Sequence, residues 1–139
     1  MKRVYICSPN NDVETAKHMV RLALYNGYVP VSPLLMYEPS IDSSIDKETK
    51  FSAKAALELL SSCEVVWAWD LMNISESMRG EINHARRMEK NVYDVCQLDD
   101  NNYLVTYQEK ASKVRRGGAL GVAQLSLTER KRSYIIYGN

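Results

Sequence analysis

Residues 64–90, EVVWAWDLMNISESMRGEINHARRMEK, decide the fold of this chain. Glu64 to Trp69 is an apolar run rich in valine and tryptophan, and such a run predicts a buried strand. A short polar segment follows, and apolar residues then recur at helical spacing from Ser77 to Lys90. The stretch is therefore a strand, a loop and an amphipathic helix, with Asp70 at the end of the strand and Glu81 in an early turn of the helix.

The same alternation of strand and helix continues on both sides of this stretch. Strands are predicted at Arg3 to Cys7, Tyr28 to Val31 and Val92 to Val95, and helices at Asp12 to Asn26 and Lys47 to Ser62. Pro30 places the second strand at a sheet edge or ends it early, and Pro33 to Asp46 is expected to be a long functional loop. This alternation predicts a flavodoxin-like or Rossmann-like three-layer αβα fold, with a parallel sheet of about four or five strands.

The alternation of strands and helices stops after Cys96. The remaining predictions are a fifth strand at Tyr103 to Tyr107, a short helix at Gln108 to Val114, a capped turn at Ser126 to Arg132 and a last strand at Tyr134 to Tyr137. Residues 109–139 carry seven lysines and arginines against two glutamates, so this end of the chain is basic. We therefore expect an α/β domain at 1–107 and a basic C-terminal extension at 108–139, packed on the domain or on a neighbouring subunit.

Composition excludes several classes of protein. The chain has 139 residues, 45% of them apolar, and a formal net charge of +1, which is typical of an ordinary soluble domain. No apolar run approaches the roughly 20 residues of a membrane span, and the N-terminal apolar segment is too short for a signal peptide. Three separated cysteines form neither a disulfide framework nor a zinc pattern, and the two histidines have no partner at ligand spacing. The expectation is a cytoplasmic protein without a membrane, metal or cofactor.

Ligands of an open parallel sheet bind beyond the carboxyl ends of its strands. Three polar segments are expected at that edge: Ser8 to Asp12, Ser32 to Tyr37 and Asp70 to Glu81. No glycine-rich dinucleotide motif and no P-loop follows a strand, so those two classes of nucleotide site are excluded.

Glu81 has no obvious structural role in its helix. If Ser75 caps the helix, the partner position of a capping box falls at Met78, so Glu81 is not a capping residue. Gly80 weakens the helix and suggests that another group approaches closely there. Glu81 and Asp70 could divide nucleophile and acid–base roles in one cavity shared with the first strand; a solvated helix glutamate and a loop aspartate are the alternative interpretations.

Four segments together resemble the nucleoside 2-deoxyribosyltransferase-like superfamily, and most closely its short bacterial and phage members. These segments are VYICSP at 4–9, NGYVPVSP at 26–33, LELLSSCEVVWAW at 57–69 and ISESMRGEINHARRMEKNV at 74–92. The resemblance covers about Lys2 to Val95, and its strongest part is the S-x-G-M-x-x-E-type motif at Ser75 to Glu81.

The resemblance implies cleavage or transfer of the N-glycosidic bond of a (deoxy)nucleoside or nucleotide. It implies that Glu81 attacks C1′ of the sugar, that Ser75 binds a substrate hydroxyl or phosphate, and that Tyr5, Ser8 and Pro9 line the site. The expected substrate-binding residues are Tyr5, Ser8, Pro9, Asn10, Ser75, Ser77 and Met78, and the expected catalytic residues are Glu81 and Asp70. It also implies a homo-oligomer, a dimer or larger, and no metal or cofactor.

Two positions depart from the pattern of the superfamily. Ser77 stands where its motif usually has glycine, and Ala56 stands where its enzymes carry an aspartate in the second helix. Asp70 could replace that aspartate from the strand end. The alternative function is a catalytically inactive protein that binds or sequesters a nucleotide-like ligand. Binding of nucleic acid by the basic extension is a weaker hypothesis, because its glycines and leucines favour packing against a subunit.

Overall fold

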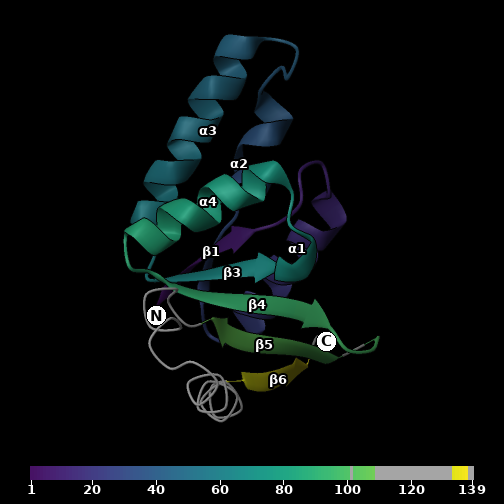
Figure 1. Cartoon of the computed structure of the whole chain (residues 1–139). Helices are drawn as coiled ribbons and strands as arrows, with labels where there is room; N and C mark the ends of the chain where they lie inside the picture. The colour runs from purple at the N-terminus through teal and green to yellow at the C-terminus, as the bar shows by residue number, and fades with distance from the viewer. Residues whose placement is uncertain (101, 109–132, 138–139) are drawn as a thin grey trace.

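The computed structural model describes residues 1–100 and 102–108 and, for β6, the backbone of residues 133–137. A six-stranded sheet runs through the middle of the molecule (Figure 1). In the order of the sheet its strands are β2 (Val29–Val31), β1 (Arg3–Cys7), β3 (Val65–Trp69), β4 (Asn91–Gln97), β5 (Asn102–Gln108) and β6 (Ser133–Tyr137). The first four are parallel, and β5 and β6 are antiparallel to their neighbours.

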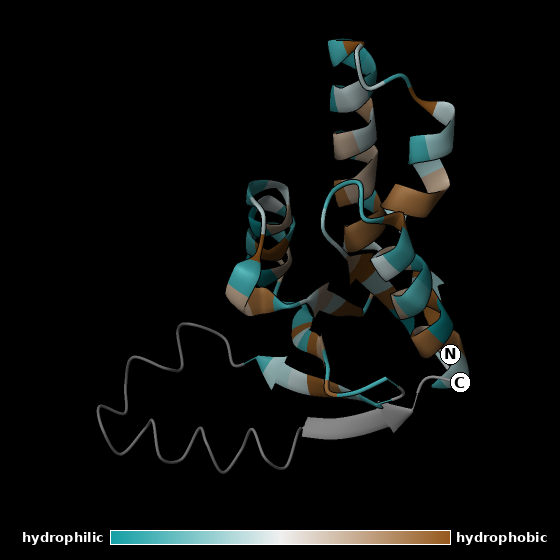
Figure 2. Ribbon diagram, turned by 90° about the vertical axis from the view of Figure 1, so that its right-hand side faces the viewer, coloured by the Kyte–Doolittle hydropathy of each residue, from teal (hydrophilic) through white to brown (hydrophobic). Residues whose placement is uncertain are grey.

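Helices cover both faces of this sheet, which confirms the predicted three-layer α/β class. They are α1 (Val13–Tyr25), α2 (Pro33–Tyr37), α3 (Asp46–Ser61) and α4 (Glu76–Arg87), with short 3-10 turns η1 (Glu38–Ser40) and η2 (Leu71–Asn73). One core cluster joins α1 to the sheet and contains Trp67, and a second joins α3 and α4 to the opposite face and contains Tyr5. Figure 2, turned by 90°, shows helices on both sides of the sheet.

The end of the sheet differs from the prediction. The connection between β4 and β5 is a tight turn, in which the Leu98 amide donates to the Asn102 carbonyl at 2.8 Å. A turn this short can join only antiparallel strands, because a parallel pair needs a long crossover. Gln108 is the last residue of β5 and not the start of a helix; the rest of that predicted helix and the predicted turn at 126–132 lie outside the described residues.

The segment predicted as a loop at Pro33 to Asp46 contains α2 and η1. Ser32 caps α2, since its Oγ accepts from the Leu35 amide at 3.4 Å, and Pro33 occupies the first helical position. The helix was missed because it has only five residues, too few to show a helical period. Together α2 and the start of α3 stand beyond the sheet (Figure 1). None of the described helices is both long and apolar enough to cross a membrane.

Asp12 fixes the start of α1, and its replacement tests that local argument. Its carboxylate accepts from the Thr15 amide at 3.1 Å and from the Thr15 Oγ1 at 2.7 Å. Asp12→Ala is expected to lower the free energy of unfolding by about 1 kcal/mol, measured by urea denaturation. Glu14→Ala is the control, because Glu14 is exposed and makes only a 3.7 Å pair with Lys17. An equal loss in both variants would contradict the capping role.

Candidate active site

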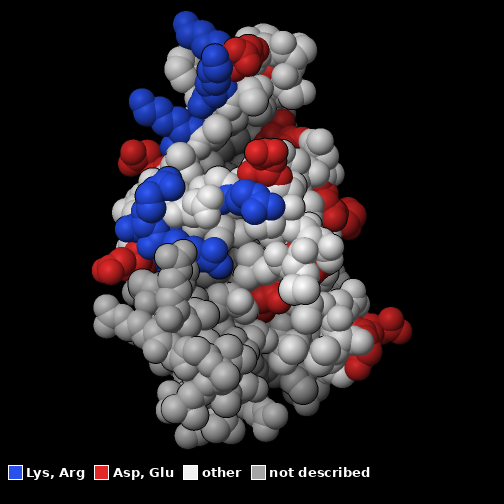
Figure 3. Space-filling model, viewed as in Figure 1, with Lys and Arg blue, Asp and Glu red and all other residues white. Residues whose placement is uncertain are grey.

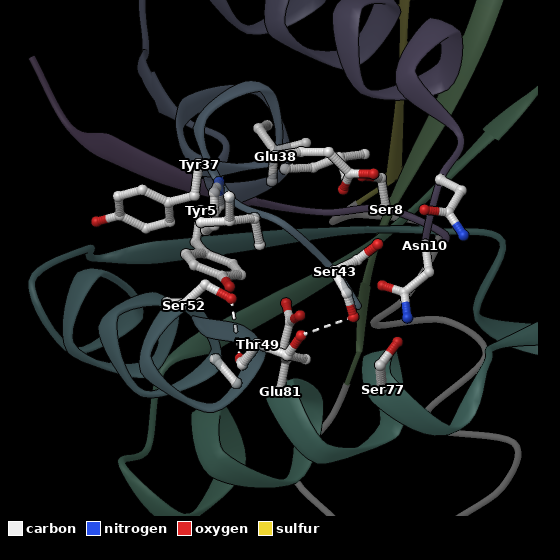
Figure 4. A pocket seen from close by; sticks show the side chains of 17 residues that line it. Tyr5, Ser8, Asn10, Tyr37, Glu38, Ser43, Thr49, Ser52, Ser77 and Glu81 are labelled. Atoms are coloured by element: carbon white, nitrogen blue, oxygen red, sulfur yellow. Dashed lines mark hydrogen bonds between the residues drawn. The ribbon is translucent and has the colours of Figure 1, made fainter. Parts of the chain in front are cut away.

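A cavity of about 450 Å³ lies between β1, α2, α3 and α4, on the sheet face opposite α1 (Figure 4). Its walls come from segments far apart in the sequence. The lining residues are Tyr5, Ile6, Ser8, Asn10 and Asn11 from β1 and the loop after it; Pro33, Leu34 and Tyr37 from α2; Glu38, Ile41 and Ser43 from η1 and the connection to α3; Thr49, Ser52, Ala53 and Ala56 from α3; and Ser77 and Glu81 from α4. One wall is apolar and aromatic, and the rest is rich in hydroxyl and amide groups.

The packing of α4 turns Glu81 into this cavity. Ser75 caps the helix, with its Oγ accepting from the Met78 amide at 3.4 Å. Met78, Ile82 and Ala85 are buried against the sheet and fix the rotation of the helix about its axis. Glu81 lies beside this apolar stripe, so its carboxylate points toward the cavity and toward Tyr5 (Figure 4).

Two weakly acidic groups lie beside the Glu81 carboxylate. Burial raises the pKa of Glu81, and the nearby Tyr5 hydroxyl and Cys7 thiol, which favour the ionised carboxylate, offset part of that increase. Burial and then the charge of Glu81 raise the pKa values of Tyr5 and Cys7 in turn. Both groups therefore keep their protons, and the three side chains form a carboxylate with two neutral donors near it.

The hydroxyl of Tyr5 has a particular position in this group. Tyr5 is fully buried in the middle of β1, yet its hydroxyl forms no hydrogen bond of normal geometry within the part of the chain that the structure describes. It is close enough to Glu81 for each group to shift the pKa of the other, but it is not aligned with the carboxylate. A buried donor without an aligned partner is unfavourable unless a ligand or a small movement satisfies it.

The wall formed by α3 was not predicted as part of the site, apart from Ala56 as the position of an aspartate in the resembled enzymes. Thr49, Ser52, Ala53 and Ala56 occupy one face of the helix at positions i, i+3, i+4 and i+7. The Ser52 Oγ donates to the Thr49 carbonyl at 2.9 Å, and the Thr49 Oγ1 to the Ser43 carbonyl at 3.4 Å. A helical stripe of small residues was the signal available in the sequence, since small side chains leave space beside a helix.

The structure brings together five of the nine predicted site residues. Those that line the cavity are Tyr5, Ser8, Asn10, Ser77 and Glu81. Pro9, Ser75 and Met78 do not line it. Ser75 is engaged as the helix cap, with its Oγ 3.1 Å from that of Ser77, and Met78 is buried in the core. Among described residues, Glu38 is the second carboxylate that lines the cavity, and no sequence argument had selected it.

Asp70 does not face the cavity, contrary to the expectation that it would share one with Glu81. Its backbone is left-handed (φ 47°) and turns the chain toward β4, where the Asp70 amide donates to the Val95 carbonyl at 3.0 Å. Its carboxylate accepts from the Asn73 side chain at 3.0 Å. Asp70 therefore lies on the β4 side of β3, whereas the cavity lies on the β1 side.

Gly80 also differs from the expectation. A Cβ atom at this position would meet no atom within 4 Å, so none of the described residues approaches the helix closely there. Among the residues that the structure describes, no three His, Cys, Asp or Glu side chains gather closely enough to hold a metal ion. The chemistry available in the described cavity is therefore that of carboxylates, hydroxyls, amides and one buried thiol nearby.

Comparisons with known proteins agree with this fold. Residues 2–95 match the model of a family described as a domain of unknown function, DUF7768. The 2-deoxyribosyltransferase of Bacillus psychrosaccharolyticus is similar in structure, with a TM-score of 0.57, 18% identity, and coverage of 68% of this chain and 72% of that one. The CMP N-glycosidase BcmB of Clostridium botulinum gives a TM-score of 0.47 at 14% identity, covering 68% of this chain and 71% of that one. The search of curated proteins gave no match. Because its model matches more than half of the sequence, this chain belongs to the DUF7768 family, and its fold is nucleoside 2-deoxyribosyltransferase-like.

Proposed function

We propose that this protein cleaves or transfers the N-glycosidic bond of a nucleoside or nucleotide, with Glu81 as the nucleophile. The observation that carries the proposal is the largely buried Glu81 carboxylate, which points into a cavity of about 450 Å³ beside two neutral donors. The fold supports it, since the similar structure from Bacillus psychrosaccharolyticus is a 2-deoxyribosyltransferase. A cavity of this size accommodates a small molecule such as a nucleoside.

The reaction would proceed in two displacements at C1′ of the sugar. The Glu81 carboxylate attacks C1′, the electrons of the C1′–N bond pass to the base, and the departing base takes up a proton. The resulting sugar ester is then attacked at C1′ by water, which gives hydrolysis, or by a second base, which gives transfer; either step frees the carboxylate again. The Tyr5 hydroxyl and Cys7 thiol would hold the carboxylate in position between the two steps.

A protein that binds the same ligands without turnover is the second candidate. Ala56 favours it, because this methyl group lines the cavity where enzymes of the resembled superfamily are expected to carry an aspartate. A binding protein would keep the apolar wall for the base and the hydroxyl groups for the sugar. It would need no nucleophile at position 81.

Incubation with nucleosides distinguishes the two candidates. The four common 2′-deoxynucleosides and their 5′-monophosphates are each mixed with the protein, with and without a second free base, and the products are separated by chromatography. Catalysis predicts a free base, and transfer predicts a new nucleoside only when the second base is present. Tight binding in calorimetry without release of any base would reject the enzyme and support the binding protein.

A further inference from the structure

The charged side chains in the described cavity lining are all acidic. Its acidic side chains are Glu38 and Glu81, and the described lining includes no lysine, arginine or histidine. The remaining polar groups are neutral hydroxyls and amides, among them Ser8, Asn10 and Ser77. A ligand in this cavity therefore meets negative charge and neutral hydrogen-bonding groups.

The lysines and arginines of the described residues lie outside the cavity lining. Lysine and arginine side chains gather over α3 and α4 on the face seen in Figure 3, and none of the described ones lines the cavity. Some have partners of their own: the Lys50 Nζ lies 3.0 Å from the Asp46 carboxylate, and the Lys90 Nζ donates to the Ser61 carbonyl at 2.9 Å. The basic residues of α3 and α4 therefore do not supply charge to the cavity.

A phosphate group needs a different environment. A phosphate monoester carries a charge of about −1.5 to −2 at pH 7, and proteins bind it with arginine, lysine or converging amide groups. Two carboxylates in the same cavity repel it, and the repulsion is stronger from the largely buried Glu81 than from Glu38, which is exposed to water. The hydroxyl groups of an unphosphorylated sugar, in contrast, donate readily to a carboxylate.

We propose that the cavity selects unphosphorylated nucleosides, and that Glu38 is the residue that excludes their 5′-phosphates. Glu38 lies in η1 on the wall across the cavity from Glu81 (Figure 4). The described lining offers a phosphate no cation to offset the two carboxylates, whereas an unphosphorylated sugar can donate its hydroxyls to them. This inference rests on the proposed function, since it names the substrate class of the same site.

Carbocyclic 2′-deoxynucleosides and their 5′-monophosphates test the proposal by calorimetry. Their ring has a carbon in place of O4′ and cannot support an oxocarbenium-like transition state, so an active protein does not consume them. Wild type is expected to bind the nucleoside at least about tenfold more tightly than the monophosphate of the same base. Glu38→Gln is expected to reduce this ratio, and Glu38→Lys to bring it to one or below.

Glu58→Lys is the matched control, because it makes the same change of charge on α3 at an exposed residue outside the lining. It is expected to leave the ratio unchanged. The inference is overturned if wild type binds the monophosphate more tightly than the nucleoside, or binds the two equally. It is also overturned if Glu38→Lys does not alter the ratio. None of these results bears on whether the protein releases base. Nucleoside preference without base release would support the inference and reject the enzyme, and no binding of either ligand would reject both.

Discussion

A Glu81→Gln variant is expected to release base from the preferred nucleoside on the order of 10³-fold more slowly than wild type, or not at all. Glutamine has nearly the same shape as glutamate, but its amide neither forms the sugar ester nor carries the charge that stabilises an oxocarbenium-like centre. A loss of this size corresponds to about 4 kcal/mol of transition-state stabilisation. The initial rate of base release at saturating nucleoside measures it.

Glu76→Gln is the matched control for this change. Glu76 is an exposed carboxylate in the first turn of the same helix and does not line the cavity, so its neutralisation removes only a weak interaction with the helix dipole. Acid-quenched wild type should carry the mass of one bound sugar, and Glu81→Gln should not. Comparable activity in wild type and Glu81→Gln would show that another group is the nucleophile.

The raised pKa of Glu81 provides a second measurement for this comparison, the dependence of base release on pH. Only the ionised carboxylate can attack C1′, and burial raises its pKa above that of a free glutamate. As the pH falls, base release by wild type should therefore decline at a higher pH than the usual range of a glutamate. The same profile is expected for Glu76→Gln, since that side chain does not contact the site.

Local patterns in the sequence predicted most of the fold. Strand β1 begins and ends as predicted. Helix α4 begins one residue earlier than predicted, at Glu76, and ends three residues earlier, at Arg87. Both elements have strong signals, a continuous apolar run in one and a capped amphipathic stripe in the other. The five-residue α2 has no such signal, and only its Ser–Pro start marks it.

The site was predicted in part, for a physical reason. The carboxyl ends of parallel strands meet at one edge, so the loop after β1 and the start of α4 could be placed together from topology alone. The contribution of α3 depends on how that helix is rotated and how far it stands beyond the sheet. The position of the Glu38 carboxylate depends on where the η1 turn lies. Those are properties of tertiary packing, and single-sequence periodicity does not contain them.

Asp70 shows the same limit at a single residue. The sequence places it correctly at the end of β3, but the side to which it turns depends on one backbone conformation. Its left-handed φ of 47° directs the chain to β4, and this conformation is uncommon for a residue other than glycine. A carboxylate at a strand end is thus a weaker predictor of a site than one held on a helix by a buried stripe.

Trp67→Ala is expected to lower the free energy of unfolding by about 3–5 kcal/mol. Trp67 is fully buried in the middle of β3, within the core cluster on the α1 face, and its ring packs edge-on against Tyr28 with centroids 5.2 Å apart. Truncation leaves a cavity that the paired strands on both sides cannot close. Urea denaturation followed by far-UV circular dichroism measures the loss without relying on tryptophan fluorescence.

Trp67→Phe separates the size of the side chain from its polar group. The indole N–H of Trp67 is buried and forms no hydrogen bond within the described part of the chain, so its removal costs no bond and relieves an unsatisfied donor. Trp67→Phe should therefore lose only about 1–2 kcal/mol, well below the loss in Trp67→Ala. Equal losses in the two variants would mean that the N–H is bonded in solution, because the missing volume alone would then not account for the destabilisation.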